Sequence, residues 1–100
     1  EGINDTKPTT FSLSQNYPNP FNPVTNFQFT VPKSSHVNIE IFNIVGQKVA
    51  TVVDGDMKAG VYTADWNGRD ENGKTVSSGI YFYRMQADDF SNMKKMVLVK

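Results

Sequence analysis

The chain has 100 residues, a formal net charge of zero at pH 7 and no cysteine. This length fits one domain with a modest core, and the neutral charge balance gives no support to a nucleic-acid-binding protein or to a protein that adheres to an acidic membrane surface. Neither disulfide bonds nor a thiolate metal site can form without cysteine, and no apolar run approaches the ~20 residues that span a bilayer.

The first ten residues, 1–10, are polar and contain a proline and several threonines. This composition predicts a flexible linker from an upstream parent protein. Because the chain begins at Glu1 and shows no signal peptide, we expect it to be a piece of a longer protein. The folded domain is expected over residues 11–100.

A proline-rich segment follows a short alternating stretch, Phe11–Leu13, that predicts an edge strand. The segment from Asn16 to Pro23 reads NYPNPFNP, and its prolines exclude both a helix and a central strand. We therefore expect a stiff loop in which Tyr17 and Phe21 both pack over the edge of the core.

The remaining segments alternate between apolar and polar residues, which predicts β-strands. The predicted strands cover Phe27–Val31, Val37–Ile41, Lys48–Val53, Gly60–Trp66, a short stretch at Lys74–Val76, and Gly79–Ala87. A final apolar run, Met96–Val99, predicts a strand that is covered on both faces. Turns are expected at Lys33–Ser35, Asn43–Gly46, Asp54–Gly55, Ala59–Gly60, Asn67–Gly73 and Asp88–Asp89.

No segment carries a sustained helical period, and the turns recur about every ten residues. This pattern predicts an all-β fold, an immunoglobulin-like antiparallel β-sandwich of about seven strands. The Cys–Trp–Cys pattern of antibody domains is absent, so this likeness concerns architecture alone.

Two groups of residues are candidates for catalysis or metal binding. His36 is the only histidine, and a small sandwich rarely gives a histidine the oriented partner and the cleft that catalysis needs; we expect no enzyme. The oxygen-bearing residues Asp65, Asn67, Asp70 and Asn72 resemble a calcium loop but lack the closing glutamate. Tight turns explain them better, so we expect no metal and no cofactor.

The aromatic residues Trp66, Tyr62, Tyr81 and Tyr83 could form a platform on which a sugar stacks. A domain of this size must bury its largest aromatic side chains to build a core, and we expect Trp66 in the core. A carbohydrate-binding accessory module of a secreted enzyme remains an alternative, as does a passive module that only stabilises its parent protein.

Two lysines, Lys94 and Lys95, are typical of a solvated strand edge, where lysine discourages aggregation between sheets. Together with Lys100 they make the last predicted hairpin basic. A partner protein could recognise such a hairpin.

Four stretches resemble, in order, the type A C-terminal sorting domains of the type IX secretion system. They are Phe11–Pro23, Asn43–Val49, Gly79–Met85 and Lys94–Lys100. The resemblance covers residues 11–100. A further stretch, Asp65–Lys74, resembles the immunoglobulin-like domain of flagellar hook-capping proteins.

The resemblance implies a non-catalytic secretion signal attached to an upstream cargo domain. In that family, the cargo first crosses the inner membrane with an ordinary signal peptide. An outer-membrane translocon and a shuttle protein then recognise the folded domain, and a cell-surface sortase often removes it. The implied location is secreted or on the cell surface, by way of the periplasm.

By position, the resemblance also assigns sorting-motif roles. The residues are Pro18, Asn19, Pro20, Gly46, Gly79, Tyr81, Lys94, Lys95, Val97 and Lys100.

Overall fold

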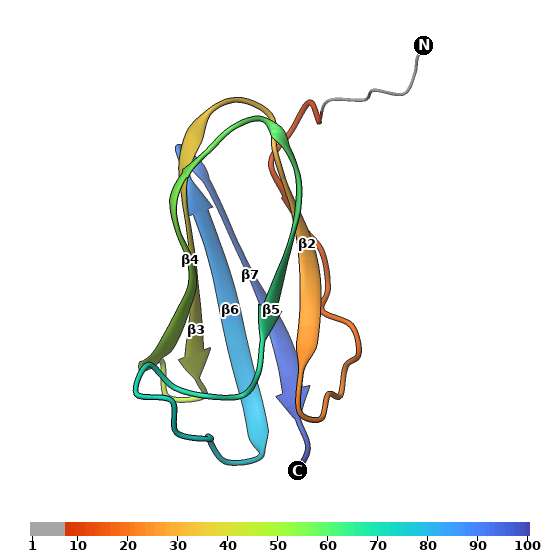
Figure 1. Cartoon of the computed structure of the whole chain (residues 1–100), viewed down its shortest axis with the longest axis vertical. Coiled ribbons are helices and arrows are strands. Elements are labelled where there is room, and N and C mark those ends of the chain that lie inside the picture. The colour runs from red at the N-terminus through yellow and green to blue at the C-terminus, as the bar shows by residue number, and fades with distance from the viewer. Residues whose placement is uncertain (1–7) are drawn as a thin grey trace.

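The structure is a computed structural model that describes residues 8–100. It forms seven strands (Figure 1): β1 (Ser12–Leu13), β2 (Thr25–Val31), β3 (Ser35–Asn43), β4 (Lys48–Met57), β5 (Gly60–Trp66), β6 (Gly79–Ala87) and β7 (Phe90–Leu98). Within these described residues there is no helix, and so none that could cross a membrane. Most of the linker predicted over residues 1–10 lies outside the described residues.

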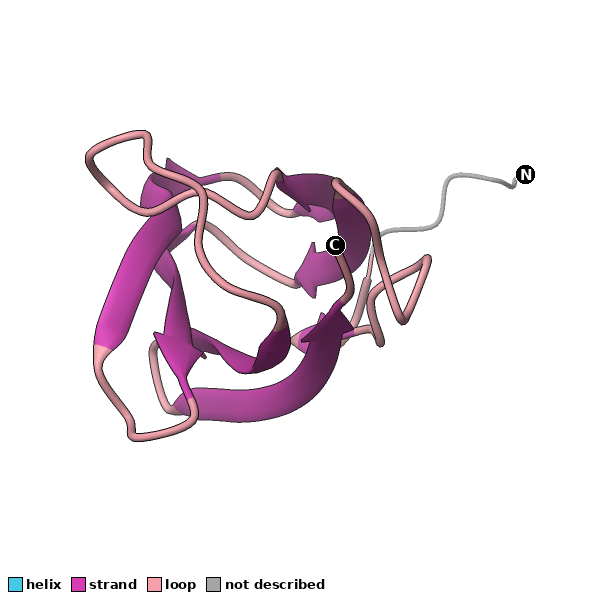
Figure 2. Ribbon diagram, turned by 90° about the horizontal axis from the view of Figure 1, so that it is seen from below, coloured by secondary structure: helices cyan, strands magenta, loops and turns pink. Residues whose placement is uncertain are grey.

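The strands form two antiparallel sheets, one ordered β1-β2-β5 and the other β4-β3-β6-β7. Figure 2, seen from below, shows the sheets enclosing the interior of the domain. The predicted immunoglobulin-like β-sandwich of seven strands is confirmed. We call the end at the bottom of Figure 1, which carries the C-terminus and the β3–β4 and β5–β6 loops, the lower end.

Alternate residues of the strands fill the core, as the two-residue period predicts. In β6 the buried residues are Tyr81, Tyr83, Met85 and Ala87. The Tyr83 ring stacks on Phe27 of the opposite sheet at a centroid distance of 4.4 Å. Aromatic pairs of this kind add stabilisation beyond the area they bury.

The turn predicted at Asp54–Gly55 is wrong, because β4 continues to Met57 and the chain reverses at residues 58–59. Asp54 and Asp56 lie opposite Asn38 and His36 of β3. Cross-strand pairing therefore overrides the local turn preference of Asp-Gly.

Two other strand predictions also need correction. Lys74–Val76 is not a strand; Thr75 makes only an isolated bridge with Arg69. Met96–Val99 is not covered on both faces, since Met96 and Leu98 are buried while Val99 is 46% exposed. Within the structure described, β7 is the last strand of its sheet and faces the core on one side only. Its residues towards the C-terminus therefore alternate between buried and more exposed positions.

His36 lies between two carboxylates on the surface of the β3–β4 pair. Its Nε2 atom is 2.8 Å from Asp54 Oδ1 and its Nδ1 atom is 3.0 Å from Asp56 Oδ1. The hydrogen bond to Asp56, followed by the bond to Asp54, raises the pKa of His36 above its ordinary value of 6.5. Both ring nitrogens form hydrogen bonds with aspartates on the exposed face of the sheet, so His36 is a surface residue.

We expect the domain to lose a little stability as the pH rises from the ordinary histidine pKa of 6.5 through the raised pKa of His36 in the folded state. The pKa of His36 is higher in the folded state, so the protonated ring stabilises the fold below the unfolded pKa, and this contribution disappears as the pH rises through the folded pKa. The side chain is exposed, so the effect is small. Thermal unfolding of His36→Asn should depend less on pH than that of the wild type; identical profiles would contradict this explanation.

Candidate recognition site

The proline-rich segment, residues 16–23, lies along the outer edge of β7. Phe21 forms a parallel bridge with Leu98. The Phe21 N–H donates to the Val97 carbonyl (2.9 Å), and the Val99 N–H donates to the Phe21 carbonyl (3.0 Å). An open strand edge is a template for aggregation, and the segment covers the lower end of this one.

Asn19 adds a side-chain contact to the same edge. Its Oδ1 atom accepts the N–H of Val97 at 3.0 Å. Further up the strand, Gln15 Nε2 donates to the carbonyl of Lys95 at 2.7 Å. The first and last motifs of the resemblance are therefore bonded to each other, although 78 residues separate Asn19 from Val97.

A buried polar cluster holds the start of the segment. The Pro18 carbonyl accepts a bond from Thr25 Oγ1 (2.8 Å) and another from Asn16 Nδ2 (3.1 Å). Asn16 and Thr25 are both buried and also bond to each other at 3.0 Å. Sequence reasoning missed these two residues, because nothing in the sequence shows that polar residues at the two ends of the proline-rich segment are buried. Buried polar groups need hydrogen bonds of this kind.

Only one of the two aromatic residues in the segment packs as expected. Phe21 is 1% exposed, whereas Tyr17 is 77% exposed, so the prediction for Tyr17 is wrong. The rings of Phe21 and Trp66 lie 5.7 Å apart, and Trp66 in turn meets Tyr81 edge-on at 5.2 Å. Phe21 is the residue that anchors the segment in the core.

Tyr81, a predicted motif residue, is part of the core. It is 5% exposed, and its hydroxyl donates to the Ser77 carbonyl at 2.7 Å. Its neighbour Tyr83 donates to the Ser14 carbonyl at 2.7 Å, and burial raises the pKa of Tyr83 to about 12. Tyr83 therefore stays neutral at physiological pH and ties β6 to the chain that leads into the proline-rich segment.

The two motif glycines lie at the lower end, Gly46 in the β3–β4 loop and Gly79 at the start of β6. Gly46 has φ 87° and Gly79 has φ 152°, conformations that L side chains rarely adopt. Neither would meet another atom if a Cβ were added, so backbone conformation rather than space favours glycine. Gly46 therefore supplies the positive φ of the turn predicted at Asn43–Gly46. Around Gly46, Asn43 Oδ1 accepts the N–H groups of Val45 and Gln47, which shapes the loop.

The C-terminal motif residues point in different directions. Lys95 is exposed on the outer face, while Lys94 is half-buried on the face that carries the buried Met96. The Lys100 N–H donates to Ser78 Oγ at 3.1 Å, beside Gly79. The expected solvated strand edge therefore fits Lys95, whereas Lys94 is only partly exposed.

The structure joins one pair of predicted motif residues by a hydrogen bond and places others beside neighbours of motif residues in β7. Asn19 contacts Val97, Gly79 pairs with Leu98, and Tyr81 pairs with Met96. No hydrogen bond joins Gly46 to these residues within the described chain. It lies at the same end of the sandwich in the β3–β4 loop.

The acidic loop between β5 and β6 forms turns. Asp70 Oδ1 accepts the N–H groups of Asn72 (2.9 Å) and Lys74 (3.0 Å), which supports the turn interpretation of this carboxylate. Among residues 8–100, no group of three or more His, Cys, Asp or Glu residues could hold a metal ion.

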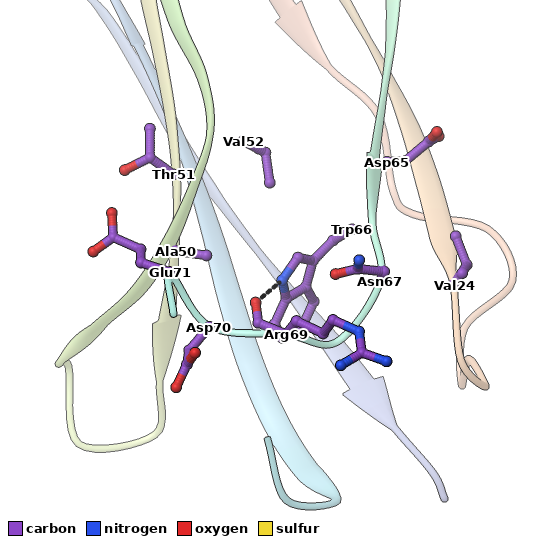
Figure 3. A pocket seen from close by; sticks show the side chains of 10 residues that line it. All are labelled: Val24, Ala50, Thr51, Val52, Asp65, Trp66, Asn67, Arg69, Asp70 and Glu71. Atoms are coloured by element: carbon purple, nitrogen blue, oxygen red, sulfur yellow. Dashed lines mark hydrogen bonds between the residues drawn. The ribbon is translucent and has the colours of Figure 1, made fainter. Parts of the chain in front are cut away.

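A hollow of roughly 530 Å³ opens beside this loop at the lower end (Figure 3). The Trp66 indole N–H donates to the Arg69 carbonyl at 2.9 Å, and the ring is 3% exposed. Tyr81 and Tyr83 are also buried. Buried rings offer no face on which a sugar can stack, so these three residues do not form the platform considered above.

Comparison with known proteins gives one family match. Residues 19–90 match the model of the FlgD Ig-like domain. No curated protein matches the chain.

Three solved structures are similar in fold. Dimeric latent PorU from Porphyromonas gingivalis is 18% identical with a TM-score of 0.72; the match covers 97% of this chain and 10% of PorU. PorZ from the same organism, an essential bacterial surface component of the type IX secretion system, is 16% identical with a TM-score of 0.56, covering 90% of this chain and 11% of PorZ.

FlgD from P. aeruginosa is 21% identical with a TM-score of 0.58, and the match covers 74% of this chain and 58% of FlgD. Compared with PorU, this chain spans only about a tenth of the length of the matched protein. Because the family model matches most of the sandwich, the chain belongs to the family of FlgD Ig-like domains.

Proposed function

We propose that this domain is a non-catalytic secretion signal of the type IX secretion system. It directs an attached cargo protein across the outer membrane for release or cell-surface attachment. The observation that carries the proposal is the bonding of the proline-rich segment to β7, which unites motifs from the two ends of the domain. The likeness of fold to PorZ, a surface component of that system, adds support.

The signal proposed here is the folded domain rather than a linear peptide. Val97 receives its contacts from Asn19 and Phe21 only when the sandwich is closed. Buried residues such as Tyr81 then act by building the fold, while the exposed residues Pro18 and Lys95 are available for contact. An unfolded domain would lose both sets of features at once.

The partners follow from the same proposal. They are the outer-membrane translocon, a shuttle protein and a cell-surface sortase, together with the upstream cargo of the same chain. The cargo would pass through the periplasm and end secreted or on the cell surface.

An export assay tests the proposal. The chain is fused behind a signal peptide and a reporter, in a bacterium that has the type IX translocon. We expect the wild-type fusion to reach the cell surface and the Lys95→Gln fusion to be retained several-fold more in the periplasm, because Lys95 is exposed and its loss should leave the fold intact.

Lys58→Gln, at an exposed position in the β4–β5 turn, is the matched control and should export normally. Thermal melts confirm that all three domains are folded. If the folded wild-type fusion stays in the periplasm, the sorting proposal is wrong and a passive stabilising module takes its place. If the wild-type fusion is exported and Lys95→Gln is exported equally well, the role assigned to Lys95 fails while the sorting proposal stands.

A further inference from the structure

The outer faces of the two sheets differ in chemistry. The face of the three-stranded sheet is mainly polar, as expected for a solvated sheet, and includes Asn26, Gln28, Thr63 and Asp65. From its middle to its lower end, the four-stranded sheet instead exposes or half-buries Phe42, Ile80, Phe82, Met93 and Val97. One face of the domain thus carries apolar side chains that the fold itself does not cover.

Strand register gathers these side chains into one surface. Phe42 pairs with Phe82, which pairs in turn with Lys95. In the next row towards the lower end, Ile80 pairs with Val97. Ile44 in the β3–β4 loop is 66% exposed and extends the surface. We call Phe42, Ile44, Ile80, Phe82, Met93 and Val97 the apolar outer patch.

The patch surrounds a shallow hollow of roughly 280 Å³ whose lining includes Phe42, Phe82, Met93 and Arg84. The Arg84 guanidinium lies 4.8 Å from the centre of the Phe42 ring. Its Nη2 atom bonds to Glu40 Oε1 at 3.2 Å, while its Nε atom is buried and has no hydrogen-bond partner among the described residues.

The charged residues around the patch are mostly cations. Arg84 and Lys48 both lie within 4 Å of the Glu40 carboxylate, and Lys95 stands opposite Phe82. This part of the face therefore carries three cations and one carboxylate, and Glu40 already bonds to two of the cations, Arg84 and Lys48. Carboxylates of a partner would be the complementary charge, and arginine can bind a carboxylate through two donors.

The upper half of the same face has a different character. Asp54 and Asp56 lie there beside His36, and Gln86 pairs with Ser91. A partner whose carboxylates sit over Arg84 and Lys95 would be repelled if it shifted towards the two aspartates. The charge pattern therefore favours one orientation of docking.

We propose that the apolar outer patch is the surface on which the outer-membrane shuttle protein docks, and that the shuttle protein presents apolar side chains flanked by carboxylates. This inference rests on the proposed sorting function and names the surface that would be read. Contiguous exposed apolar surface commonly marks an interaction site. The cations at its margin supply orientation and salt dependence.

Binding to the purified shuttle protein of a type IX host, held in detergent micelles, tests the inference. We expect Met93→Ser and Lys95→Glu each to weaken binding by roughly tenfold, the scale of an interface residue that contributes to affinity. Rising salt should weaken wild-type binding. The matched controls are Val61→Ser, an exposed valine on the other sheet, and Lys58→Glu in the β4–β5 turn; both should bind like the wild type.

The outcomes distinguish failure of the patch assignment from failure of the proposed sorting function. If the wild-type domain is exported and binds the shuttle protein, but Met93→Ser and Lys95→Glu bind equally well, the patch assignment is overturned and the sorting function stands. If the wild-type domain is neither exported nor bound, the sorting function itself fails. If the domain dimerises in solution through the patch, and Met93→Ser makes it monomeric without changing shuttle binding, the patch is a self-interface and the inference is wrong.

Discussion

Replacing Phe21 with alanine should cost about 3–5 kcal/mol of unfolding free energy, the range for deleting a buried phenylalanine side chain. Phe21 is 1% exposed and packs against Trp66. Its backbone also holds Val97 and Val99. Because domains of this kind are stable by only ~5–15 kcal/mol, the variant should lie close to unfolding.

Tyr17→Ala is the matched control, since it removes an aromatic side chain from the same segment. Tyr17 is 77% exposed, and substitutions at such positions usually change stability by less than about 0.5 kcal/mol. Urea unfolding, followed by tryptophan fluorescence, measures both variants. If the two variants lose equal stability, Phe21 does not anchor the segment.

Removing Met96–Lys100 should abolish folding. The truncation deletes two buried side chains, Met96 and Leu98, each of which contributes ~1.5–3 kcal/mol by burial. It also removes the strand edge to which Asn19 and Phe21 bond. We expect the truncated chain to give a far-UV spectrum without β-sheet character and a flat thermal scan.

Removing Lys100 alone is the control for this truncation. Its backbone N–H makes one bond to Ser78, so the loss should be near 1 kcal/mol. A truncated chain that lacks Met96–Lys100 yet unfolds cooperatively would show that β7 is dispensable for the fold.

The alternating pattern of the sequence was sufficient to predict most of the fold. Strands β2, β3, β5 and β6 were predicted because their inward residues, such as Ile39 and Tyr83, recur every second position. The need of a small domain to bury its largest aromatic side chains correctly placed Trp66 in the core. Pattern reasoning failed at Asp54–Gly55, where strand pairing with β3 decides the conformation.

The recognition site was only partly predictable. Resemblance supplied Asn19 and Val97, but the bond between them depends on tertiary folding that brings distant segments together. The different exposures of Tyr17 and Phe21 could not be read from a segment in which both are aromatic residues beside proline. Asn16 and Thr25 were missed for a similar reason, because their burial results from the path of the loop.

The apolar outer patch was also absent from the sequence-based prediction. Phe82 and Met93 lie in strands whose opposite face fills the core, so each strand taken alone meets the expectation for a half-buried strand. Only the register between β3, β6 and β7 shows that the outward apolar residues meet.

The most direct test of the central claim compares this domain with another that shares its fold. The FlgD Ig-like domain of P. aeruginosa belongs to the same family, with a TM-score of 0.58. Each domain is fused to the same signal peptide and reporter in a bacterium that carries the type IX translocon, and the surface-exposed fraction of the reporter is measured by protease accessibility on intact cells.

We predict that the fusion with this domain reaches the surface and that the FlgD fusion, although folded, remains in the periplasm. Equal export of both would show that the shared fold is sufficient for export and that the motif residues are not a recognition signal. Export of neither, with both domains folded, would contradict the proposal that this domain is a sorting signal.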